Sequence, residues 1–140
     1  MITATQTYTG VAGRILLGVY FLIPGITKVT NFQDTADYMQ DHGMIFVPFF
    51  LVLTIIVQLA GAAMLMTGYR VAPTAFILAG LTLVISLAMH DFWNVEAGIQ
   101  QAHETQNFVK NLAIMAGLMA LAGGQRTLAM SVDKAKNAAD

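Results

Sequence analysis

The chain has 140 residues, of which 56% are apolar and 11% are charged, whereas soluble domains carry roughly 25% charged residues. The formal net charge of −1 gives no electrostatic basis for binding nucleic acid. Cysteine is absent, which excludes disulfides, thiol catalysis and metal sites built on cysteine. The composition therefore favours a protein that resides in a lipid bilayer.

Four uncharged runs follow one another, at 15–27, 44–69, 71–89 and 111–125. A helix needs about 20 apolar residues to cross the hydrocarbon core. The middle two runs suffice, and the outer two suffice if Arg14 and Lys110 reach the interface or are paired. We predict an all-α, polytopic membrane four-helix bundle with spans at about 8–28, 45–67, 72–90 and 107–123. Residues 124–140 are then a cytoplasmic tail.

The segments around these spans carry their own signals. Pro24-Gly25 should kink the first span or end it early. The polar stretch 31–43 is expected to form a short surface helix that Gly43 ends. The tight link Gly68–Arg70 makes the second and third spans antiparallel neighbours. Residues 94–106 are expected to be a long polar connection, and 130–140 a frayed helix end.

A repeat is visible in the spacing of basic residues. Arg14, Arg70 and Arg126 are 56 residues apart, and the same offset aligns Gly61 with Gly117. The offset suggests two repeated helix hairpins. The alternative is a chance match between small residues that pack helices together.

The distribution of charge predicts an orientation. One membrane face carries five basic residues: Arg14, Arg70, Arg126, Lys134 and Lys136. The other carries two basic residues, Lys28 and Lys110, and six acids. Basic residues prefer the cytoplasmic side, so both termini are expected in the cytoplasm and all three histidines on the outer side. The expected location is a bacterial inner membrane.

The third span ends in an unusual sequence, His90-Asp91-Phe92-Trp93-Asn94. A charge buried in lipid costs about 2.5–3.5 kcal/mol, so a pair between Asp91 and Lys28 or Lys110 is expected at this depth. A histidine beside an acid can accept a proton near neutral pH. Trp93 fits an anchor at headgroup depth.

The candidate binding or polar-network residues are Arg14, Lys28, Gln58, His90, Asp91, Trp93, Lys110 and Asn111. In one interpretation they surround an outward-facing pocket for a polar head, such as that of a quinone or a small acid. In the other they only fix helix packing. Gln58 needs a partner from another helix, because an unpaired buried amide costs roughly 1–3 kcal/mol. The histidines lie on separate segments, and we predict no metal site and no catalytic residue.

Four segments carry a resemblance. In order and spacing, they resemble segments of the DoxX family of small membrane proteins. The four segments are Arg14 to Lys28 with its Pro-Gly pair, Asn31 to Gly43, His90 to Trp93, and Phe108 to Met115. The resemblance covers about 13–124. It implies a four-helix membrane protein and a link to redox metabolism, since the family is named after the membrane subunit of a thiosulfate:quinone oxidoreductase. The family commonly has an acid in the second helix where this chain has Gln58.

Three functions are compatible with the sequence. We expect an accessory subunit or partner of a larger respiratory or redox assembly in the membrane, without chemistry of its own. The alternatives are a quinone-linked oxidoreductase component and a carrier of a small solute. The expected partners are the lipid bilayer and a protein partner or a second copy of the chain; no cofactor is firmly implied, although a quinone is a candidate.

Overall fold

The computed structural model describes the backbone of residues 4–137 and the side chains of residues 8–124. Its elements are α1 (Ala4–Thr30), α2 (Phe32–Asp41), α3 (Val47–Thr67), α4 (Val71–Met89), the 3₁₀ helix η1 (Phe92–Asn94) and α5 (Ile99–Asn137). Four of them, α1, α3, α4 and α5, contain stretches long and apolar enough to cross a membrane. The all-α four-helix prediction is therefore confirmed.

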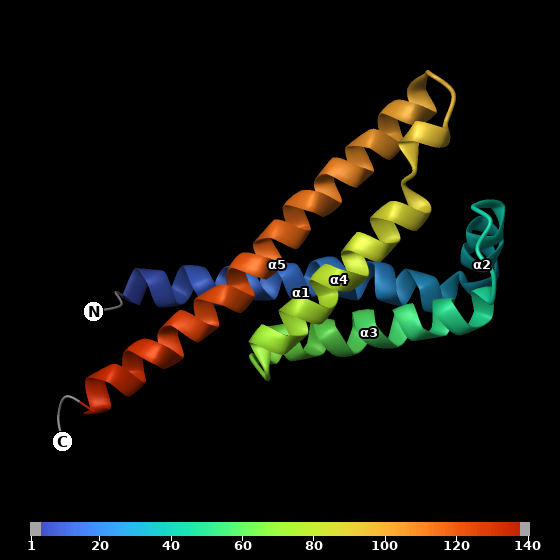
Figure 1. The fold of residues 1–140 in the computed structure, drawn as a ribbon. Coiled ribbons are helices and arrows are strands. Elements are labelled where there is room, and N and C mark those ends of the chain that lie inside the picture. Colours follow the sequence, from blue (N-terminus) through green and yellow to red (C-terminus); the bar gives the residue numbers. More distant parts are fainter. Residues whose placement is uncertain (1–3, 138–140) are drawn as a thin grey trace.

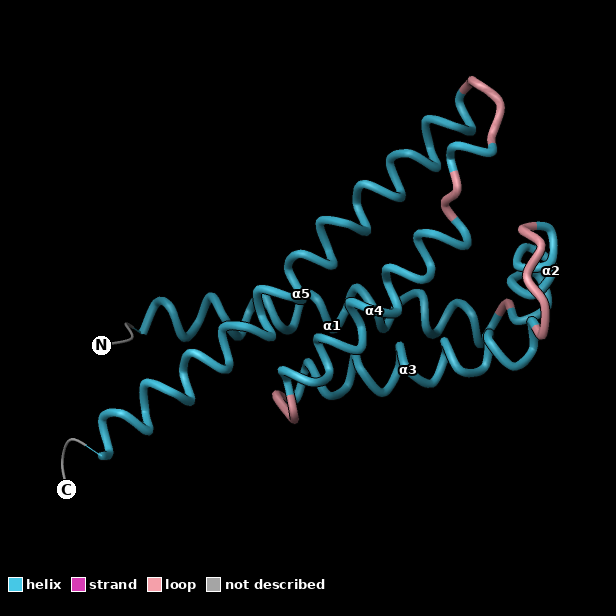
Figure 2. Tube along the Cα trace, viewed as in Figure 1, coloured by secondary structure: helices cyan, strands magenta, loops and turns pink. Residues whose placement is uncertain are grey.

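The long helices form two antiparallel hairpins. α1 packs along α3 and α4 packs along α5, while α3 and α4 share a smaller contact. The hairpins cross obliquely and separate toward the end that carries α2 and η1 (Figure 1). The other end carries the α3–α4 turn, the start of α1 and the end of α5, and the described loops are confined to the ends of the helices (Figure 2). The tight link thus makes α3 and α4 neighbours, but each packs more extensively against another helix.

Two boundaries differ from the sequence prediction. α1 continues through Pro24 to Thr30, because ending a helix in lipid would leave several backbone groups unsatisfied at several kcal/mol each. That exceeds the cost of about 3 kcal/mol for a proline inside a helix. α5 begins at Ile99 rather than near 107, since residues 99–116 contain no Gly or Pro and are rich in helix-forming residues. The polar residues of this segment therefore belong to a helix and not to a loop.

The hairpins pack most closely in the half nearest the α3–α4 turn. A buried cluster there joins all four long helices through residues that include Phe21, Ala62, Ala75, Leu78 and Leu118. A Cβ added at Gly61 would lie 2.9 Å from Leu78 Cδ2, so the absence of a side chain lets α3 approach α4. The corresponding Gly117 has open space around it. The proposed repeat therefore has no matching helix contact at this position, and the duplication itself stays a prediction.

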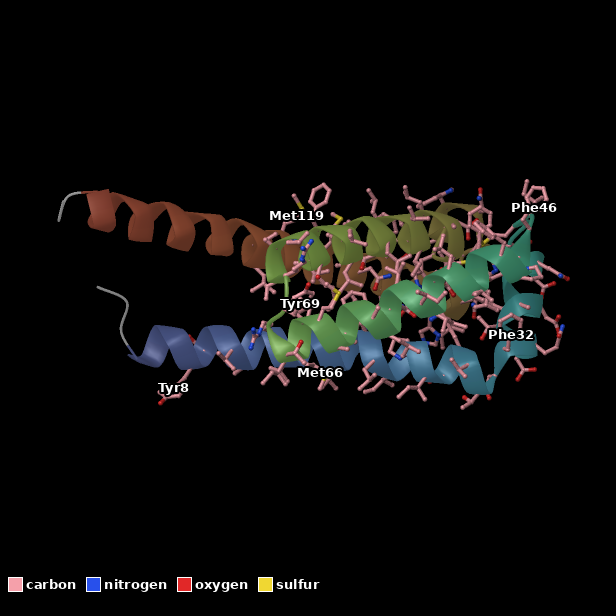
Figure 3. The ribbon with its side chains drawn as sticks, turned by 90° about the horizontal axis from the view of Figure 1, so that it is seen from below. Tyr8, Phe32, Phe46, Met66, Tyr69 and Met119 are labelled. Carbon is pink, nitrogen blue, oxygen red and sulfur yellow. The ribbon has the colours of Figure 1, made fainter. Side chains whose placement is uncertain are left out.

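The α3–α4 turn is fixed by Gly68. Its φ of +81° lies in the left-handed region, and its N–H donates to the Met64 and Leu65 carbonyls at 3.0 and 3.3 Å. The Arg14 guanidinium from α1 lies directly on this glycine, where a Cβ would overlap it. Gly68 thus allows both the turn and the approach of Arg14. Tyr69 in the same turn is exposed, close to the place where α3 meets α4 (Figure 3).

Gly68→Ala should destabilise the protein by about 1–3 kcal/mol, because a side chain in the left-handed region is strained and the Arg14 side chain would have to move. The free energy of unfolding in mixed micelles measures the effect. Gly80→Ala is the matched control: Gly80 lies inside α4 with nothing within 4 Å of an added Cβ, so helix propensity predicts a neutral or stabilising change. Equal losses in both variants would contradict the assigned role of Gly68.

Candidate functional site

A cavity of about 680 Å³ lies between the two hairpins in the half of the bundle near α2. It is lined by side chains from α1, α2, α3 and α4, most of them apolar, among them Ile23, Met39, Leu51, Val57, Leu81 and Ile85. Polar side chains also contribute to its wall: Lys28, Tyr38, His90 and three threonines. The cavity occurs where the hairpins have begun to separate, and α2 covers its end through buried contacts of Ala36 and Met39 with α3 and α4.

His90 follows the last residue of α4 and is held by α5. Its Nδ1 lies 2.8 Å from Glu104 Oε2. Glu104 is only 6% exposed, and its second oxygen, Oε1, accepts a hydrogen bond of 3.2 Å from Gln100 Nε2. A carboxylate on Nδ1 favours a proton at that nitrogen, which leaves Nε2 for another partner. The pair therefore orients a ring that also lines the cavity.

Tyr38 reaches the same region from α2. Its hydroxyl donates to the Met89 carbonyl at 3.5 Å. Partial burial raises the pKa of the Tyr38 hydroxyl above its ordinary value, and the negative charges of Glu104 and Asp91 raise this pKa further. The hydroxyl consequently keeps its proton at all physiological pH values and remains a hydrogen-bond donor.

Lys28 comes from the last turn of α1 and is half-buried. Its Nζ makes one long contact, 3.5 Å to the Pro24 carbonyl. Among the described side chains, the one ion pair joins His90 and Glu104, so no described carboxylate neutralises Lys28. A cation with spare donors thus stands at the cavity wall.

The expected pairing of Asp91 with Lys28 or Lys110 is wrong for this structure. Asp91 Oδ2 accepts a hydrogen bond from Asn94 Nδ2 at 2.8 Å, and Lys110 Nζ donates to Asn107 Oδ1 at 3.0 Å. The physical reason is local: η1 folds Asn94 back onto Asp91, and the exposed Lys110 finds a partner on its own helix. The acid that contacts the end of α4, the third span, is Glu104.

The remaining candidates lie elsewhere. Asn111 accepts a hydrogen bond from the Tyr20 hydroxyl at 3.0 Å, which links α5 to α1. Trp93 is half exposed and packs edge-on against Phe92 and Phe108, consistent with an interfacial anchor. Gln58 is buried, but its Oε1 has no partner, so the partner expected from another helix is not found for this atom. Arg14 lies at the opposite end, on the α3–α4 turn.

The sequence prediction missed Glu104 and Tyr38. Glu104 was assigned to a polar connection, yet Gln100, Glu104, Asn111 and Leu118 follow helical spacing along one face of α5. A helix that continues through residues 99–118 on this spacing places Glu104 on the face that packs against α4, near the end of the third span. Nothing in the sequence indicates that Tyr38 of a surface helix would turn toward the end of α4. In the described part of the chain, no three His, Asp or Glu side chains gather as metal ligands would.

Comparison with known proteins bears on this arrangement. The sequence model of the DoxX family matches residues 10–91, which is more than half of the chain. The chain belongs to the DoxX family. Two proteins of Escherichia coli strain K12 are similar to it: inner membrane protein YqjF is 33% identical over 110 residues, covering 78% of each chain. Inner membrane protein YphA is 25% identical over 109 residues, covering 78% of this chain and 77% of its own. No solved structure matches significantly.

The DoxX match includes Lys28, Tyr38 and His90 of the cavity wall and ends at Asp91. Glu104 lies beyond it. In this DoxX protein the residue that orients His90 therefore comes from a part of the chain outside the matched family segment.

A double-mutant cycle on His90→Gln and Glu104→Gln should give a coupling energy of about 1–3 kcal/mol, because the two side chains touch in a largely water-free place. The measurement is the free energy of unfolding of the two single variants and the double variant in mixed micelles. Asp91→Asn is the control and should cost less than about 1 kcal/mol, since its partner Asn94 is exposed. Additive effects of the His90 and Glu104 changes would refute the pair.

Proposed function

We propose that this DoxX protein is an accessory membrane component of a redox assembly that holds a quinone-class molecule in the cavity between its two hairpins. The observation that carries the proposal is the 680 Å³ cavity whose apolar wall includes Lys28, Tyr38 and His90. Its volume lies within the roughly 300–1,000 Å³ typical of small-molecule sites. An apolar wall with a few polar groups suits a molecule that is soluble in lipid but has a polar head.

The polar groups match the chemistry of a quinone head. Quinone carbonyls accept hydrogen bonds, and the Lys28 ammonium has donors to spare beyond its contact with the Pro24 carbonyl. The single proton of the Tyr38 hydroxyl is directed at the Met89 carbonyl, so this side chain contributes a polar oxygen to the wall. Since the Nδ1 proton of His90 faces Glu104, its Nε2 is left as an acceptor, which suits a hydroxyl of the reduced, quinol form of the ligand. A bound quinone supplies the transfer of electrons together with protons, whereas the chain's own residues bind and orient it. Glu104 acts as a positioning residue through His90.

An accessory role is favoured by what the sequence supplies. Without cysteine the chain has no thiol pair and no cysteine-ligated cluster to exchange electrons with the ligand. The electron donor or acceptor is then expected in a partner subunit. YqjF and YphA are both named as inner membrane proteins, and we extend that location to this chain.

We further propose that both termini face the cytoplasm. Single cysteines at Tyr69 and Gly98 test this cleanly, because the chain has no native cysteine and both positions are exposed at opposite ends of the bundle. An impermeant thiol reagent applied to spheroplasts should label Gly98→Cys and spare Tyr69→Cys. Labelling after lysis confirms that both sites react. The reverse pattern in spheroplasts would overturn the orientation.

His90→Leu should reduce the quinone that co-purifies in mild detergent by roughly tenfold, because a lost hydrogen bond in a dry site is worth about 1.4 kcal/mol. His90→Gln keeps a polar side chain and should lose less. Extracted quinone per mole of protein, measured by mass spectrometry, is the readout. The matched control is His103→Leu, an exposed histidine outside this cavity. Unchanged quinone in a folded His90→Leu variant would refute the site.

A further inference from the structure

A second polar site lies at the opposite end of the bundle, on the α3–α4 turn. The Arg14 guanidinium crosses from α1 and rests on Gly68. Arg70, two residues further along the same turn, is exposed and has a left-handed φ of 43°. Its guanidinium carbon lies 5.8 Å from the centroid of the Tyr69 ring. The guanidinium groups of Arg14, from α1, and of Arg70, from the turn itself, are thereby brought to one three-residue turn.

Neither arginine has a counter-ion among the described side chains. Arg14 Nε is buried and has no hydrogen-bond partner. The one ion pair among the described side chains joins His90 and Glu104, at the opposite end of the bundle. Arg14 also belongs to a candidate membrane span, and a buried polar atom without a hydrogen-bond partner costs free energy. An anion supplied from outside the described protein would offset that cost.

We propose that Arg14 and Arg70 form a binding site for the phosphate of an anionic phospholipid. The turn follows the end of an apolar span of 21 residues, Val47–Thr67, which places it at the level of the lipid headgroups. A guanidinium binds a phosphate through two parallel hydrogen bonds, and basic groups gathered between membrane helices bind anionic headgroups. Tyr69, exposed in the same turn, provides an aromatic ring of the kind enriched at that depth.

The proposal does not depend on the quinone site. Lys28, Tyr38 and His90 line the cavity near α2, whereas Arg14 and Arg70 lie at the α3–α4 turn. Gly68 contributes by lacking a side chain, since a Cβ there would displace the Arg14 guanidinium.

The test is lipid binding by native mass spectrometry of the detergent-purified full chain, titrated with phosphatidylglycerol or with phosphatidylcholine. We expect wild type to bind phosphatidylglycerol more tightly than phosphatidylcholine. Arg70→Gln should weaken phosphatidylglycerol binding at least fivefold, and Arg14→Gln should do the same. Lys110→Gln is the matched control, because it removes an exposed positive charge from the other end of the bundle and should leave binding within twofold of wild type.

Arg14→Lys separates charge from geometry, because it keeps the positive charge but cannot form the two parallel hydrogen bonds of a guanidinium. Its affinity for phosphatidylglycerol should lie between those of wild type and Arg14→Gln. This variant also serves if Arg14→Gln does not fold. Inorganic phosphate at millimolar concentration should not displace the lipid, since it lacks the acyl chains; displacement would show that the site takes free phosphate instead. Unchanged binding in Arg70→Gln, or an equal loss in Lys110→Gln, would overturn the proposal.

Discussion

The requirement that backbone groups in lipid be hydrogen-bonded within the chain governs most of this structure. It carries α1 through Pro24, where a helix in water would more readily end. It also makes α5 one continuous helix from Ile99, although its first turns are polar. Irregular backbone is left to the ends of the helices, and Lys28, His90 and Arg70 lie close to such ends as well. The two candidate sites consequently lie toward opposite ends of the bundle, the cavity near α2 and the arginine pair at the α3–α4 turn.

The obliquely crossed hairpins create the space between those ends. Close contact near the α3–α4 turn depends on small residues, with Gly61 against Leu78 and Gly68 under Arg14. Because the hairpins diverge from this contact, the opposite half cannot be filled by the same helices, and α2 packs across it through Met39. The cavity is thus a consequence of the crossing, and the polar ends of α1 and α4 supply Lys28 and His90 to its wall.

The His90–Glu104 contact couples this cavity to the α4–α5 hairpin. A change in the hydrogen-bond partner of His90 would alter its contact with Glu104, a carboxylate that also accepts a hydrogen bond from Gln100. Since breaking one member of a buried pair leaves the other uncompensated, the pair restrains α4 and α5 to one register at the cavity wall. A ligand at His90 would therefore meet a ring that is already oriented.

The sequence by itself determined the class of the protein and the presence of four apolar helices, because hydropathy depends only on local composition. It also identified His90, Lys28 and Arg14 as costly groups near span ends, since charges in apolar runs are visible without a fold. The partners of these groups were decided by the tertiary structure. Glu104 rather than Asp91 meets His90 because η1 turns Asp91 toward Asn94 while α5 returns beside α4. Likewise, the cavity and the approach of Arg14 to Gly68 arise from the crossing of two hairpins, a relation between distant segments that no local pattern specifies.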